Sequence, residues 1–66
     1  MSVAKHVEIT SASSKSFEDA IKKGIKKTAE TVKNIEAAWI KEQKVVVKGD
    51  DVSEYRVTMK VTFIIK

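Results

Sequence analysis

The fold of this chain is decided by residues 55–65, which read YRVTMKVTFII. Apolar side chains occupy every odd position of this stretch, and mostly polar side chains occupy the even positions. Because side chains alternate between the two faces of a β-sheet, the pattern predicts a strand with one apolar face, which we extend to residues 52–66. Residues 35–48 are rich in valine and isoleucine and predict a second long strand. Between the two, Lys48-Gly49-Asp50-Asp51 predicts the turn of a hairpin, since glycine tolerates positive φ.

The N-terminal part of the chain predicts a strand followed by a helix. Residues 3–10 alternate in polarity and present one apolar face, which indicates a short strand. The serines that follow can cap a helix, with Ser16 and Ser14 as equally fair candidates. From Phe17 onward apolar residues recur at steps of three and four, which predicts an amphipathic helix ending near Asn34. Its apolar stripe comprises Phe17, Ala20, Ile21, Gly24, Ile25, Thr28, Ala29 and Val32.

The order β-α-β-β predicts an α+β fold in which one helix packs on a three-stranded antiparallel sheet. We expect this single domain to span residues 1–66. Gly24 lies within the apolar stripe, which we interpret as room for close contact between helix and sheet. Counting outward from the hairpin turn places Ala38, Ile40 and Val46 on the face that the helix covers. The opposite face then carries Ala37, Trp39, Lys41, Gln43, Val45 and Val47.

A sheet with a single helix has one uncovered face. A domain of this size buries only about 60% of its unfolded surface, and the chain has no cysteine for a disulfide. A strand of about 13 residues at roughly 3.4 Å per residue runs about 44 Å. A compact domain of this length has a diameter of only roughly 28 Å. We therefore expect the strands to extend beyond their own helix onto other copies, in a homo-oligomer.

Composition and charge exclude several classes of function. The net charge is +4, and we interpret the lysines of the predicted helix as a solvated face, so we expect no nucleic-acid partner. No apolar run reaches the roughly 18 residues of a membrane span, and the N-terminus lacks the apolar stretch of a signal peptide. We expect a cytoplasmic protein without a membrane partner. With one histidine and no cysteine, no nucleophile–base set can be assembled, and we expect no enzymatic activity.

The length, the β-α-β-β order, the serine-rich entry to the helix at Phe17 and the strand motif of residues 55–63 together resemble the dodecins. The resemblance covers nearly the whole chain, from Val3 to Ile65. It implies a hollow shell of twelve identical subunits with tetrahedral symmetry. It also implies binding of flavins (FMN, riboflavin or FAD) as stacked pairs near two-fold axes.

Two positions depart from the flavin-binding pattern that the resemblance implies. Ala37 stands where the family has a tryptophan that stacks on the flavin, and Arg56 stands where it has a glutamine that bonds the ring. Alanine offers no aromatic face, and arginine only donates hydrogen bonds. The chain looks closer to the calcium-dodecin branch, which its Tyr55-Arg56 pair and a second pattern both resemble. That pattern consists of Asn34, Ile35, Ala38, Glu42 and Gln43.

Trp39 lies two residues beyond Ala37 and has two interpretations. It is either a relocated stacking platform for a planar ligand or an aromatic plug in a subunit interface. The ligand-binding candidates are Ala37, Trp39, Gln43 and Arg56.

Glu42 is the candidate metal ligand, because the resemblance places an acid there near the channels of the shell. Three copies around a three-fold axis could supply oxygens for calcium, whereas a salt bridge with Lys41 or Lys44 is the simpler explanation. Asp50 and Asp51 could hold a cation, but turn chemistry also explains them.

Two functions follow as expectations. The first is a non-enzymatic, dodecin-like homododecamer that binds or stores a small, flavin-type ligand, with flavin affinity reduced by Ala37 and Arg56. The alternative is a structural or calcium-binding dodecamer without flavin.

Overall fold

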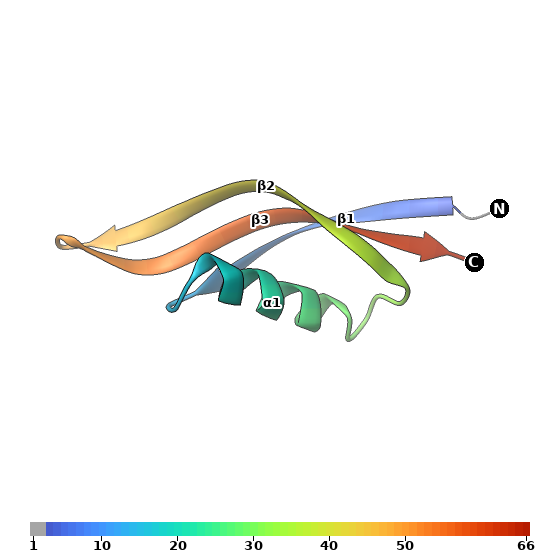
Figure 1. The fold of residues 1–66 in the computed structure, drawn as a ribbon, viewed down its shortest axis with the longest axis horizontal. Coiled ribbons are helices and arrows are strands. Elements are labelled where there is room, and N and C mark those ends of the chain that lie inside the picture. The colour runs from blue at the N-terminus through green and yellow to red at the C-terminus, as the bar shows by residue number, and fades with distance from the viewer. Residues whose placement is uncertain (1–2) are drawn as a thin grey trace.

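The computed structural model describes residues 3–66, and its elements follow the predicted order. Strand β1 (Val3–Ser13) leads into helix α1 (Phe17–Thr28), and the long strands β2 (Ile35–Lys48) and β3 (Asp51–Ile65) form a hairpin. The sheet is antiparallel with the order β1-β3-β2, so β3 is central and the other two strands are edges. The helix lies along one face of this sheet (Figure 1). The predicted β-α-β-β fold, with one helix on a three-stranded sheet, is confirmed.

A hydrogen-bonded group of side chains starts the helix. Ser16 is the N-cap, and its hydroxyl accepts a bond from the backbone N–H of Asp19 at 3.0 Å. The hydroxyl of buried Ser13 donates to the carboxylate of Asp19 at 2.6 Å and accepts from the backbone N–H of Lys15 at 2.9 Å. Of the two predicted caps, Ser16 is therefore the one used.

The helix ends at Thr28, so the prediction that it reaches Asn34 is wrong. Ala29 and Val32 fit the apolar stripe, which extended the predicted helix, but the chain must turn back toward the sheet to begin β2. Asn34 makes that turn with φ 62°, a left-handed conformation that asparagine tolerates better than most residues. Its backbone oxygen accepts a bond from the N–H of Ile64 at 3.0 Å, which fixes the chain to β3. Strand β1 also continues to Ser13, beyond its predicted end at residue 10.

The core lies between α1 and the middle of β3. Ala20, Val57, Met59 and Val61 are fully buried. Side chains from the other three elements, β1, α1 and β2, pack around them, namely Val7, Ile9, Phe17, Ile21, Ile25, Ile35 and Ile40. At the start of the helix the ring of Phe17 meets that of Tyr55 edge-on, with centroids 5.2 Å apart. The predicted apolar face of β3 therefore forms the centre of the core.

The register of the hairpin differs from the predicted one over part of its length. Ala38 pairs with Val61 and Ile40 with Met59, so both lie on the helix side as predicted. Bulges between Ile40 and Glu42 and between Val46 and Val47 shift the pairing of the residues between them by one. Val46 pairs with Glu54 and lies on the opposite face, so its predicted placement is wrong. Gln43 and Val45 pair with Val57 and Tyr55 on the helix side, and Val47, which follows Val46 on β2 without an intervening residue, lies on that side too. The predicted placement of these three residues on the open face is therefore also wrong.

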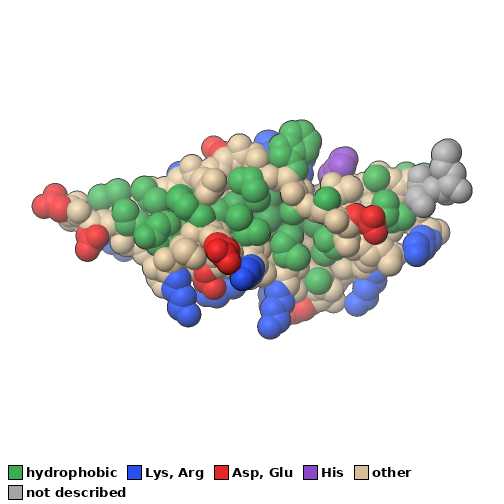
Figure 2. Space-filling view, in the orientation of Figure 1, with side chains coloured by type: hydrophobic (Ala, Val, Ile, Leu, Met, Phe, Trp, Pro, Cys, Tyr) green, Lys and Arg blue, Asp and Glu red, His purple; other side chains and the backbone are tan. Residues whose placement is uncertain are grey.

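The molecule is elongated because the hairpin continues past the helix (Figure 1). Its extents are 51 × 19 × 13 Å, and its radius of gyration is 13.5 Å, compared with about 11 Å for a compact domain of this length. We call residues 44–54, which project beyond the N-terminal end of α1, the hairpin arm. Figure 2 shows hydrophobic side chains along this part of the molecule and acidic side chains at its tip. The predicted extension of the strands beyond their helix is confirmed.

Candidate ligand-binding face

The candidate site lies on the outer face, which we define as the face of the sheet opposite α1. The strand registers place its residues in rows that cross the three strands in the order β1-β3-β2. From the end of the sheet near the chain termini toward the arm, these rows are His6–Thr62–Ala37, Glu8–Lys60–Trp39, Thr10–Thr58–Glu42 and Ala12–Arg56–Lys44. The face is thus mostly polar, with one large aromatic side chain in its second row.

Trp39 is the dominant feature of the outer face. It is 60% exposed, and it lies on the edge strand β2, where no helix covers it. The Nζ of Lys60, which pairs with Trp39 across the hairpin, lies 5.4 Å from the centre of the indole ring. A cation over an aromatic face is stabilising by about 0.5–1 kcal/mol at an exposed site. The pair therefore offers a planar ligand an aromatic face and a nearby positive charge.

Polar interactions join the strands around Trp39. Lys41 of β2 reaches across β3 to Glu8 of β1, with Nζ and Oε1 3.1 Å apart. His6 Nδ1 lies 3.0 Å from the hydroxyl of Thr62. Exposed contacts of this kind add modestly to stability, but they orient the polar side chains that surround the indole.

The four ligand-binding candidates do not meet within one chain. Ala37 and Trp39 share the outer face two residues apart on β2. Arg56 lies on the same face but four residues from Lys60 along β3, or about 14 Å at strand spacing. Its Nε is joined to Glu54 Oε1 at 2.5 Å. Gln43 lies on the helix side, so a site that used all four residues would need a second copy.

The comparisons with known proteins agree with this fold. A family model described as Dodecin matches residues 3–66. The chain belongs to the dodecin family. No curated protein sequence matches it.

Solved dodecin structures superpose closely on the chain. A substituted form of the dodecin from T. thermophilus has a TM-score of 0.95 at 26% identity, covering 100% of this chain and 98% of that chain. The dodecin from Streptomyces davaonensis has a TM-score of 0.94 at 23% identity, covering 98% and 96%. The calcium-chelating antigen calcium dodecin from Mycobacterium tuberculosis has a TM-score of 0.84 at 26% identity, covering 97% and 91%.

The carboxylates of the described residues do not cluster into a metal site within one copy of this dodecin. Within residues 3–66 no three acidic or histidine side chains gather in a group that could hold a metal. Glu42 is exposed on the outer face opposite Thr58. Lys41, one of its two predicted salt-bridge partners, is instead joined to Glu8. A calcium site at Glu42 would therefore need carboxylates from other copies of this dodecin.

Sequence reasoning missed Lys60 as the neighbour of Trp39. The signal was present, because counting outward from the pair Lys48–Asp51 at the turn places residue 39 opposite residue 60.

In the described part of this dodecin, the helix is neither long nor apolar enough to cross a membrane.

Proposed function

We propose that this dodecin is a non-enzymatic, self-assembling protein that binds and stores a planar, flavin-type ligand at Trp39. One observation carries the proposal: the only tryptophan of the chain is 60% exposed on a sheet face that no helix covers. Its position on the edge strand β2 also leaves it close to any copy that pairs along that edge. A ligand could then stack between elements of two subunits.

The ligand chemistry follows from the surroundings of the indole. Its aromatic face suits a flat conjugated ring, and Lys60 favours a ligand that carries negative charge or accepting oxygens. Ala37 adds room beside the indole, since its side chain ends at Cβ. FMN, with a conjugated ring and a phosphate, combines these features best, and riboflavin and FAD share the ring.

The affinity should be lower than in a dodecin with the family's flavin-stacking tryptophan and its glutamine. Here Ala37 and Arg56 occupy those positions, and Arg56 is engaged with Glu54. Loss of a stacking contact costs of order 1 kcal/mol beyond its buried area. We therefore propose a site that binds flavin in the micromolar range and releases it readily.

The proposed assembly is a homododecamer of single domains, each spanning residues 1–66. An outer face without a helix, two edge strands and a projecting hairpin arm all support contact with further copies. A cytoplasmic location and the lack of nucleic-acid and membrane partners complete the proposal.

The test is a titration of FMN with the protein, followed by the fluorescence of the flavin. The indole should quench the flavin on stacking, Trp39→Ala should abolish the quenching, and Trp39→Phe should retain part of it. Riboflavin in place of FMN should bind more weakly if Lys60 contacts the phosphate, and Lys60→Gln should remove that difference. Unchanged FMN fluorescence at tens of micromolar protein would contradict flavin binding.

A second function is a structural or calcium-binding dodecamer without flavin. It is favoured by the alanine and arginine at positions 37 and 56, and by the similarity to a calcium dodecin at 26% identity. In this case calcium should raise the melting temperature of the assembled protein, by the linkage of binding to folding, and Glu42→Gln should remove the rise. A melting temperature that responds to neither calcium nor chelator would leave only the structural role.

A further inference from the structure

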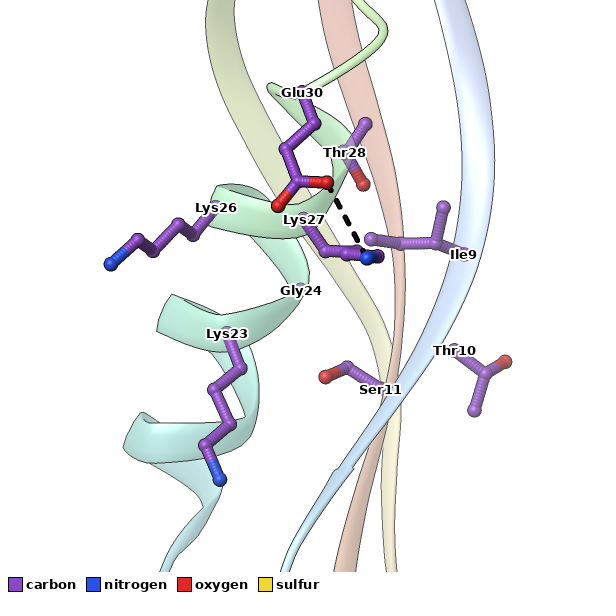
Figure 3. Close-up of a pocket in the computed structure, with 9 residues that line it drawn as sticks. All are labelled: Ile9, Thr10, Ser11, Lys23, Gly24, Lys26, Lys27, Thr28 and Glu30. Atoms are coloured by element: carbon purple, nitrogen blue, oxygen red, sulfur yellow. Dashed lines mark ion pairs between the residues drawn. The ribbon is translucent and has the colours of Figure 1, made fainter.

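A groove of about 580 Å³ lies between α1 and β1 (Figure 3). Ile9 of β1 and the bare backbone of Gly24 on α1 give it an apolar part. Hydroxyl groups from both elements also line it, those of Ser11 and Thr28, whereas the hydroxyl of Thr10 points to the outer face. Because α1 packs on the sheet near one edge, nothing within residues 3–66 fills this space.

The rim of the groove is basic. Lys23, Lys26 and Lys27 project from α1, and the acidic residue among the lining side chains is Glu30. Figure 3 shows Lys27 directed toward Ile9 and joined to Glu30, while Lys26 points away from the strands. Lys26 has no ion-pair partner among the described residues. The groove therefore suits an occupant that is apolar in its body and negatively charged at its end.

The hairpin arm of the same chain has these properties. Val45, Val47 and Val52 are 40%, 58% and 42% exposed, and they make up half of the exposed large hydrophobic residues of the described chain. The tip carries Asp50 and Asp51, neither of which forms an ion pair within residues 3–66. Exposed apolar side chains next to a charged tip are typical of a surface that docks onto a partner.

The arm cannot reach the groove of its own chain. It projects beyond the N-terminal end of α1 (Figure 1), whereas the groove lies beside residues 23–30 in the C-terminal half of the helix and beyond. Any contact between the two surfaces therefore joins different copies.

We propose that the hairpin arm of one copy docks into the α1–β1 groove of a second copy. The valines of the arm lie against the apolar part of the groove, and Asp50 and Asp51 face Lys26 and Lys27. The proposal rests on the self-assembly proposed above and names the surfaces that make it. The contact joins two different surfaces, so every copy gives one arm and receives another, and such a contact closes into a ring when the rotation between copies allows it.

A charge exchange tests the proposal. The arm variant Asp50→Lys/Asp51→Lys has a basic arm and a basic groove, and the groove variant Lys26→Glu/Lys27→Glu has an acidic arm and an acidic groove. Each alone should assemble only at concentrations at least tenfold higher than the unchanged protein. An equimolar mixture should assemble at a lower concentration than either variant alone, since the arm of one variant then meets a groove of opposite charge on the other. Lys22→Glu/Lys33→Glu alters as many charges outside the groove and serves as the control, which should assemble normally.

Light scattering measures the mass in each case, and circular dichroism verifies that every variant is folded. A second measurement uses the unchanged protein, grown as a mixture of ¹⁴N- and ¹⁵N-labelled copies and treated with a carbodiimide. Cross-links of Asp50 or Asp51 to Lys26 or Lys27 should then join peptides of different isotope content.

Normal assembly of both variants, or cross-links that avoid these residues, would overturn the arm–groove contact while leaving self-assembly intact. In that event the groove is open to a small anionic amphiphile instead. If the unchanged protein is itself a folded monomer, self-assembly fails and the contact fails with it.

Discussion

Gly24 of α1 lies against Met59 of β3 so closely that a Cβ atom at position 24 would come within 2.8 Å of Met59 Cε. The same Cβ would be 3.0 Å from Ser11 Cβ on β1. The absence of a side chain on the helix therefore sets how near α1 approaches the sheet. This confirms the interpretation of Gly24 as the point of close contact.

Gly24→Ala should destabilise the protein although alanine favours helices. The propensity gain is about 1 kcal/mol, but fully buried Met59 must move and the Ser11 contact must lengthen. Overpacking of this kind costs about 1–3 kcal/mol, so we expect a net loss of about 1 kcal/mol in a urea titration at fixed protein concentration. In a Met59→Leu background the loss of folding free energy caused by Gly24→Ala should be smaller, because leucine lacks the Cε atom that the new Cβ would contact. An unchanged or raised urea midpoint for Gly24→Ala alone would contradict this packing.

Ser16→Ala should cost about 1 kcal/mol of folding free energy, because it removes the acceptor for the backbone N–H of Asp19. Ser14→Ala is the matched control. Ser14 is exposed and does not cap the helix, so its removal should change the urea midpoint little. Equal effects of the two substitutions would mean that the cap is shared.

Stability should fall in acid through the titration of Asp19. A hydrogen bond from Ser13 and another from Lys23 hold the pKa of Asp19 below its ordinary value of 3.8. A carboxyl group whose folded-state pKa is lowered stabilises the protein above its unfolded pKa, and this contribution is lost as the pH falls through the folded pKa. We expect Asp19→Asn to flatten the dependence of the urea midpoint on pH below about pH 4, and Ser13→Ala to weaken it. If Asp19→Asn leaves the dependence of the urea midpoint on pH unchanged, other titrating groups cause the loss of stability in acid.

The fluorescence of Trp39 should distinguish its two interpretations. As the only tryptophan of the chain, it reports on its own environment without interference. A ligand platform remains open in the assembled protein, so iodide should quench its emission, and added FMN should reduce that quenching. An indole already shielded from iodide in the assembled protein without flavin would instead identify an interface plug.

Much of the fold could be predicted because the alternation of β3 is so regular. Apolar side chains at every odd position from Tyr55 to Ile65 define its buried face, and the turn at Gly49 defines its partner. The end of the helix could not be predicted, since Ala29 and Val32 continue the apolar stripe while the tertiary fold requires a turn at Asn34.

The faces of β2 were predicted correctly only before the first of two bulges. One bulge lies on β2 after Ile40 and the other on β3 opposite Val46 and Val47, so together they restore the predicted pairing but not the predicted faces of residues 43–47. Ala38 and Ile40 are therefore placed correctly, whereas Gln43, Val45, Val46 and Val47 lie on the face opposite to the predicted one. Neither bulge contains a glycine or any other residue from which a bulge could have been predicted. The site residue Gln43 lies between the two bulges, so the sequence alone could not predict on which face of the sheet it lies.

The sheet has one face that no helix of the described chain covers, and we expect further copies of the chain to cover it. Native mass spectrometry of the purified protein at low micromolar concentration tests this most directly. We predict a single closed assembly with the mass of twelve chains. A stable, fully folded 7.4 kDa monomer under the same conditions would contradict it.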